Sequence, residues 1–84
     1  MQFQRTILKR LYRRRIIGGK HTAIEHLTAG ISGHLIGEAK RTIAELVKKG
    51  YLLPKPTSYG LQISINPEKM PEILEIIEGG YSQK

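Results

Sequence analysis

Apolar residues recur along the first part of the chain at the spacing of one helix face. Between Phe3 and Ile17 they return every three to five residues, which is the period of an α-helix that buries one side. Gly18 and Gly19 follow directly, and we expect them to end the helix. The pattern predicts a helix over residues 3–17, with a buried stripe made of Phe3, Ile7, Leu8, Leu11, Tyr12, Ile16 and Ile17.

A second, short helix is indicated by a capping signal. Thr22 is followed three residues later by Glu25, the arrangement of a capping box, in which a hydroxyl and a carboxylate satisfy backbone N–H groups that the helix itself cannot pair. We expect the helix to begin at Thr22, to direct Leu27 inward, and to break near Gly30, where glycine accepts the left-handed conformation.

The third and longest helix is expected over residues 32–49. Ile31 before its start and Ile36 in its first turns have the spacing of a hydrophobic staple, which fixes how the chain enters a helix. Gly50 should end it, after two lysines whose charges suit the negative end of the helix dipole. The buried stripe of this helix is predicted to contain Leu35, Ile36, Ala39, Ile43, Leu46 and Val47.

Two short strands joined by a turn should follow. Residues 51–55 and 61–65 are the candidates, and the second alternates Leu, Ile and Ile with polar residues, the period of a half-buried strand. Pro54 and Pro56 cannot donate to a central ladder, so the first strand should lie at a sheet edge. We expect a hairpin whose second strand faces the core through Leu61, Ile63 and Ile65.

The chain closes with one more helix. Asn66 and Pro67 form a turn signal, and Pro71 suits the first helical position, where a missing N–H costs nothing. Gly79 should end this helix. We therefore expect a single domain over residues 1–84, with an ordered core of about 3–78 and a frayed tail at 79–84.

Charge and composition narrow the functional classes. The 84 residues contain 14 Lys and Arg against 7 Asp and Glu, a formal net charge of +7, and no Cys. A charge this large on a small body attracts polyanions, nucleic acid first. The absence of Cys removes disulfides and thiolate metal sites, and no run approaches the roughly 18 apolar residues of a membrane span. We expect a cytoplasmic, nucleoid-associated protein that does not bind membranes.

The order of elements, helix, short helix, longer helix, hairpin, helix, resembles the winged helix-turn-helix superfamily of DNA-binding domains, small archaeal members included. The resemblance covers roughly residues 3–77, and its most specific part is GEAKRTIAELVKKGYLLPKP, which is similar to a recognition helix followed by the first wing strand. It implies an α+β, mostly α fold with a three-helix core, a β-hairpin wing and a C-terminal helix. One departure is His26, where the superfamily usually has a small residue.

The resemblance implies double-stranded DNA as the partner, with helix 32–49 in the major groove and wing 51–65 on the backbone. On this basis Arg41 is the candidate base reader and Gly37 the point of close approach, while the first helix forms a phosphate clamp. For any one cation a merely solvated helix face remains the alternative. The candidate DNA-binding residues are Ser32, His34, Gly37, Lys40, Arg41, Lys55, Tyr59, Arg10, Arg13, Arg14 and Lys20.

Two glycines in the third predicted helix leave two interpretations open. Gly33 and Gly37 would each cost about 1 kcal/mol in a helix interior, so they need a structural or functional reason. Either a partner approaches the helix closely at these positions, or the helix crosses another helix tightly inside the core. The residues alone do not choose between these two causes.

Other chemistry is weakly supported. His21, Glu25 and His26 lack the spacing of paired metal ligands, and no nucleophile stands beside a base in a known motif. We therefore expect no catalysis, metal or cofactor. The expected role is a small transcriptional regulator whose DNA binding is either sequence-specific or general, and a general architectural DNA binder stays open. An RNA-binding or protein-interaction adaptor is the alternative, and a homodimer through the terminal helices is an open hypothesis.

Overall fold

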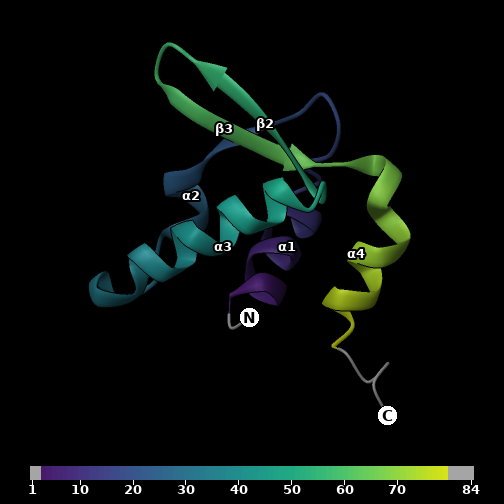
Figure 1. The fold of residues 1–84 in the computed structure, drawn as a ribbon, viewed down its shortest axis with the longest axis horizontal. Coiled ribbons are helices and arrows are strands. Elements are labelled where there is room, and N and C mark those ends of the chain that lie inside the picture. The colour runs from purple at the N-terminus through teal and green to yellow at the C-terminus, as the bar shows by residue number, and fades with distance from the viewer. Residues whose placement is uncertain (1–2, 80–84) are drawn as a thin grey trace.

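The computed structural model describes residues 3–79, in which four α-helices pack with a three-stranded antiparallel sheet (Figure 1). Two short 3-10 turns, Gly33–Leu35 and Pro67–Lys69, precede the last two helices. The expected α+β, mostly helical class is confirmed. In chain order the elements are α1 (Gln4–Arg13), β1 (Thr22–Ala23), α2 (Ile24–Thr28), α3 (Ile36–Lys48), β2 (Leu52–Thr57), β3 (Gly60–Ile65) and α4 (Met70–Ile77).

The first helix ends four residues earlier than its apolar stripe predicts. Arg15 has a positive φ of 58°, its N–H donates to the Tyr12 carbonyl (3.0 Å), and the Ile16 N–H donates to the Leu11 carbonyl (3.0 Å). These two bonds form a Schellman motif, which normally has glycine at the left-handed position. Ile16 stays buried after the turn, whereas Tyr12 is 38% exposed and does not belong to the buried stripe.

The segment before α2 is a strand and not a cap. β1 pairs antiparallel with β3, so the backbone of Thr22 is extended in the sheet and cannot start the helix. The Thr22 hydroxyl is hydrogen bonded to Nδ1 of His26 (3.1 Å), and α2 has no side-chain cap. The predicted capping box is therefore wrong. The side chain of His26 is exposed, so it does not lie between α2 and α3 and does not hold these two helices apart.

A 3-10 turn delays the start of the third helix. The N–H of Leu35 donates to the Ser32 carbonyl (2.8 Å), the Ser32 hydroxyl makes no capping bond, and α3 begins at Ile36. At the other end Gly50, with φ 85°, follows the helix as predicted. The long central helix is confirmed, but its first turn is tighter than an α-helix.

The first strand of the hairpin lies at an edge of the sheet, as expected. The strand order is β1-β3-β2, so the strand that carries Pro54 and Pro56 lies at the edge of the sheet, where a missing N–H is tolerated. Both strands are longer than predicted, and only Ser58 and Tyr59 separate them. The hairpin consequently extends beyond the helices (Figure 1).

This length changes the environment of one predicted core residue. Ile63 and Ile65 are fully buried, as predicted, but Leu61 is 40% exposed. Leu61 pairs with Pro56 near the hairpin tip, where the sheet has passed the helices that would cover it. The assignment of Leu61 to the core is therefore wrong.

The last helix is tied to the end of α3. The Asn66 side chain accepts a bond from the Glu68 N–H (3.0 Å) and donates to the Gly50 carbonyl (2.8 Å). α4 then starts at Met70, one residue before the predicted Pro71, which lies in the first turn where its missing N–H is harmless. The predicted frayed tail lies mostly outside the described residues.

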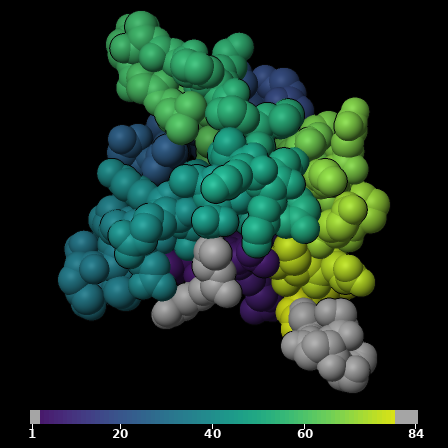
Figure 2. Space-filling view, viewed as in Figure 1, coloured from purple at the N-terminus to yellow at the C-terminus, as the bar shows by residue number. Residues whose placement is uncertain are grey.

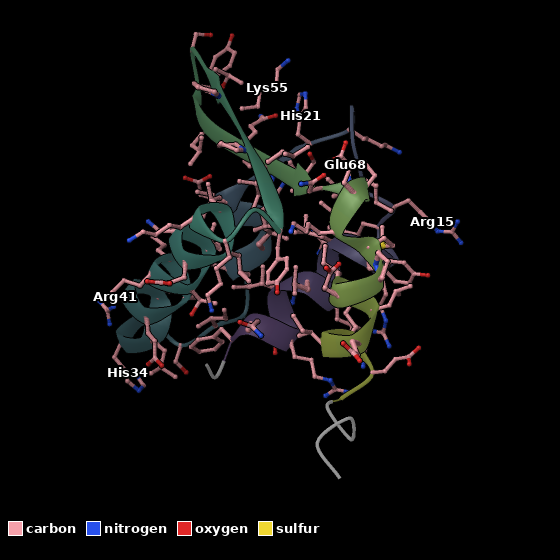
Figure 3. The ribbon with its side chains drawn as sticks, turned by 45° about the vertical axis from the view of Figure 1, so that its right-hand side comes forward. Arg15, His21, His34, Arg41, Lys55 and Glu68 are labelled. Carbon is pink, nitrogen blue, oxygen red and sulfur yellow. The ribbon has the colours of Figure 1, made fainter. Side chains whose placement is uncertain are left out.

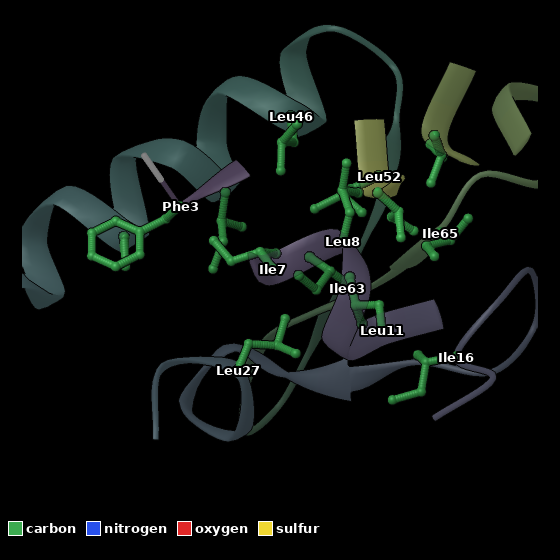
Figure 4. Close-up of a cluster of buried hydrophobic side chains, with 14 residues drawn as sticks. Phe3, Ile7, Leu8, Leu11, Ile16, Leu27, Leu46, Leu52, Ile63 and Ile65 are labelled. Atoms are coloured by element: carbon green, nitrogen blue, oxygen red, sulfur yellow. The ribbon is translucent and has the colours of Figure 1, made fainter. Parts of the chain in front are cut away.

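The core brings together side chains from α1, α2, α3, α4 and the sheet (Figure 4). Buried polar side chains within it are bonded: the Ser64 hydroxyl donates to the Gly18 carbonyl (2.9 Å) and the Thr42 hydroxyl to the Glu38 carbonyl (3.1 Å). The fully buried large apolar residues are Ile7, Leu8, Leu11, Leu27, Ile43, Leu46, Leu52, Ile63, Ile65 and Ile73.

Candidate nucleic-acid interface

The outer face of α3 gathers most of the residues predicted for a groove. Gly37, Lys40 and Arg41 are all exposed, and they share the face with Ala44 and Lys48, because spacings of three, four and seven residues fall on one side of a helix. Ser32 and His34 are exposed in the turn before it. Arg41 of α3 and His34 of the preceding 3-10 turn lie on the same side of the molecule (Figure 3).

Arg41 lies beside two carboxylates. Glu38, Arg41, Thr42 and Glu45 line a surface hollow of about 240 Å³, and both glutamates are half-buried. The predicted set contained Lys40 and Arg41 of this helix, but neither Lys48 nor the two glutamates. Their spacing of three and four residues from Arg41 was the available signal.

The two glycines of this region lie outside the helix interior. Gly33 is in the 3-10 turn and Gly37 is the second residue of α3. A Cβ at Gly33 would meet nothing within 4 Å, and one at Gly37 would meet only Nη1 of Arg41, at 3.8 Å. No core element crosses the helix here, so the tight-crossing interpretation is wrong for both positions.

The hairpin tip presents the predicted aromatic residue on a defined turn. Tyr59 is 96% exposed. Thr57 holds the turn: its hydroxyl donates to the Gly60 carbonyl (2.7 Å) and accepts from the Tyr59 N–H (3.1 Å). Lys55 is exposed on the edge strand, near the top of the view in Figure 3. The role of Thr57, which follows Pro56 directly, was not predicted from the sequence.

Two predicted phosphate ligands, Arg10 of α1 and Arg14 directly after it, bind the protein itself. Nη1 of Arg10 donates to the Leu27 carbonyl (2.6 Å) and the Ala29 carbonyl (2.9 Å), and Nη1 of Arg14 donates to the His26 carbonyl (3.4 Å). These carbonyls are at the C-terminal end of α2, where helices have unpaired acceptors and a partial negative charge. Arg10 is therefore a helix cap as well as a surface cation.

Arg5, which was not among the predicted site residues, has the same role for the last helix. Its Nε donates to the Ile77 carbonyl (2.7 Å) at the end of α4. The predicted ligands Arg13 and Lys20 are exposed. A second surface hollow, of about 230 Å³, is lined by Arg5, Thr6, Lys9, Arg10 and Arg13.

The histidines of the β1–α2 region are engaged within the protein. Nδ1 of His21 donates to the Gln62 side-chain oxygen (2.8 Å) across the sheet, and His26 bonds Thr22. Within residues 3–79, no three His, Asp or Glu side chains gather as metal ligands would. Over the same residues, no helix has the length and apolarity needed to cross a membrane.

No protein-family model, curated protein or solved structure matches this chain. Function is consequently inferred from the geometry and charge of α3 and the hairpin.

Proposed function

We propose that the protein is a winged-helix protein that binds double-stranded DNA and acts as a small, nucleoid-associated transcriptional regulator in the cytoplasm. The observation that carries the proposal is the exposed face of α3, with Lys40 and Arg41 on it, combined with a hairpin that extends past the helices and exposes Lys55 and Tyr59. The element order and the antiparallel sheet support a winged-helix layout.

The shape of the α3 face suits a major groove. The groove of B-DNA is about 12 Å wide and admits a helix. Gly37 and Ala44 are exposed on the same face as the cations, so small residues allow the backbone of α3 to approach the base edges. Glu38 and Glu45 beside Arg41 repel phosphates, which favours a base edge over the backbone as the target of Arg41.

The hairpin supplies contacts outside that groove. Lys55 would pair with a phosphate, and the ring of Tyr59 would lie against the sugar-phosphate backbone or in the minor groove. Because Thr57 already fixes the turn, little backbone freedom is lost when the tip binds.

The first test compares duplex DNA, duplex RNA and single strands of random sequence across a salt series. The double variant Lys40→Ala with Arg41→Ala is compared with a control, Lys49→Gln with Lys69→Gln. The control also removes two positive charges, but next to Gly50: a Cβ placed on Gly50 would lie 3.7 Å from Cε of Lys69. We expect the α3 pair to weaken duplex-DNA binding about tenfold or more, and the control pair to weaken it about twofold or less.

Equal losses in the two pairs would mean that only net charge matters and would contradict a recognition face on α3. Preference for RNA would favour the RNA-binding alternative, and no nucleic-acid binding at all would favour a protein-interaction adaptor. The feature that supports an adaptor is the exposure of two apolar hairpin residues, Leu53 at 38% and Leu61 at 40%, which lie on opposite faces of the hairpin.

A homodimer through the terminal helices is proposed as the form that would read a palindromic site. Ile77 belongs to the core, whereas Leu74 and Ile76 of α4 are half-buried and offer the apolar contact. Tyr81, part of the same hypothesis, lies outside the described residues. Sedimentation of the wild type and of Leu74→Lys tests it: a dimer should dissociate in the variant, and a monomeric wild type would contradict it.

A further inference from the structure

The outer face of α1 is a second concentration of positive charge. Arg5, Lys9 and Arg13 are four residues apart and fall on the side of α1 opposite its fully buried residues Leu8 and Leu11. The helix contains no Asp or Glu. The hollow of about 230 Å³ on this face is lined by these three cations together with Thr6 and Arg10.

Two of these cations are held in place by helix ends. Arg5 uses Nε to bond the Ile77 carbonyl (2.7 Å), and Arg10 uses Nη1 for both of its bonds to α2. A guanidinium has five N–H donors in a rigid fork, so each arginine keeps donors beyond those that it uses. The bonded guanidinium groups of Arg5 and Arg10 beside Lys9 and Arg13 form a partly pre-organised site for phosphate oxygens.

Repulsion along the row favours the binding of an anionic partner. Like charges four residues apart on a helix repel each other, and here two such pairs, Arg5 with Lys9 and Lys9 with Arg13, follow one another on a single face. A chain of phosphates would neutralise the whole row at once. The row therefore fits an extended polyanion better than a small anion.

This face points away from the face of α3. The two helices pack on each other through their buried sides, and the exposed sides consequently diverge. α1 lies behind α3 in Figure 1, and the space-filling view of the same side shows α1 largely covered by α3 (Figure 2). A duplex seated on α3 and the hairpin would not reach the outer face of α1.

We propose that the outer face of α1 is a second DNA-binding surface that takes the phosphate backbone of a separate duplex segment, so that one molecule bridges two duplexes. The inference rests on the proposed function for the first duplex. It assigns Arg13 to the second surface and not, as expected from the sequence, to the backbone of the first duplex.

The test is a bridging experiment with two duplexes of random sequence, one fixed to beads and the other fluorescent and free. Lys9→Gln with Arg13→Gln removes two cations that cap no helix in the described structure, and Lys49→Gln with Lys69→Gln is the charge-matched control. The affinity for one duplex at trace concentration is measured for every variant, and Lys40→Ala with Arg41→Ala is included.

We expect the wild type and the control pair to retain the free duplex on the beads. The α1 pair should lower retention about fivefold or more while its affinity for one duplex stays within about twofold of wild type. Three results would overturn the inference: no bridging by the wild type, undiminished bridging by the α1 pair, or an equal fall in retention and single-duplex affinity, which would place α1 on the first duplex.

The two proposals fail in different measurements. If Lys40→Ala with Arg41→Ala binds one duplex as tightly as wild type, the proposed function of α3 is wrong, whatever the α1 pair does. If the α3 pair loses single-duplex affinity but the α1 pair bridges normally, the function stands and the second surface is wrong. Bridging by a dimer of the protein would likewise persist in the α1 pair and would count against the inference.

Discussion

Arg15 ends α1 in a conformation that suits glycine. Its φ of 58° costs an L-residue roughly 1–2 kcal/mol, while glycine adopts it freely but loses more entropy on folding. We expect Arg15→Gly to raise the free energy of unfolding by about 1 kcal/mol, measured by urea denaturation. Arg15→Ala is the control, because it removes the same charge but keeps the strain. An equal gain in both variants would mean that charge repulsion, and not the backbone, was relieved.

Substitution of Gly37 by alanine should affect folding stability and DNA binding in different ways. A methyl group there would meet only Nη1 of Arg41, at 3.8 Å, and alanine favours helix by up to about 1 kcal/mol over glycine. Gly37→Ala should therefore leave the melting temperature unchanged or raise it slightly. Because the methyl group would stand between α3 and the groove, we expect duplex affinity to fall about threefold or more. Unchanged affinity would rule out close approach at Gly37.

At the scale of elements, α2 depends on α1. It has five residues, too few to be stable alone, and Arg10 binds the carbonyls at its C-terminal end. Hydrogen bonds to a charged group contribute about 1.5–3 kcal/mol, so Arg10→Ala should lower the free energy of unfolding by about 1–3 kcal/mol. Arg13→Ala, one turn along and exposed, should change it by less than about 0.5 kcal/mol. Similar losses in both would show that Arg10 does not support α2.

The hairpin is expected to make one charged and one uncharged contact with DNA, and the salt dependence of binding distinguishes the two. Lys55→Ala should weaken duplex binding and reduce the salt dependence by about one phosphate contact, because a counterion is no longer released. Tyr59→Ala should weaken binding with an unchanged salt slope, since the ring carries no charge. Neither exposed residue should affect thermal unfolding. A salt slope that shifts with Tyr59→Ala, or stays constant with Lys55→Ala, would contradict these roles.

Periodicity and turn chemistry predicted the elements that are long and regular. The body of α1, the central helix α3 and the edge position of β2 followed from apolar spacing, Gly50 and the prolines. β1 did not, because two residues carry no period and Thr22 needs the edge of β3 to become extended. The end of α1 was missed for a similar reason: Arg15 is forced into a glycine conformation by the burial of Ile16 against the core.

At the scale of the whole molecule, charge alone could not show which cations bind the protein itself and which are exposed to a partner. The exposed set on α3 and the hairpin followed from spacing, since residues that avoid the apolar stripe share one face. Arg10 and Arg14 look the same as Arg13 in the sequence, yet they reach carbonyls of α2 that only tertiary packing brings near. The opposite directions of the two basic faces also depend on how α1 and α3 pack, which no local pattern specifies.

The salt dependence of binding to one duplex tests whether the cations of α1 and those of α3 with the hairpin bind different duplexes. Among the exposed cations of α3 and the hairpin, Lys40, Lys48 and Lys55 are the expected phosphate ligands, since Arg41 is assigned to a base edge. Each phosphate contact contributes about −0.9 to the slope of log K against log salt, so we expect a slope of about −3 at trace DNA. If Arg5, Lys9 and Arg13 of α1 joined the same duplex, the slope would steepen toward about −5, and Lys9→Gln with Arg13→Gln would reduce it by about two. On our proposal that variant leaves the single-duplex slope unchanged, because its missing charges face a different duplex.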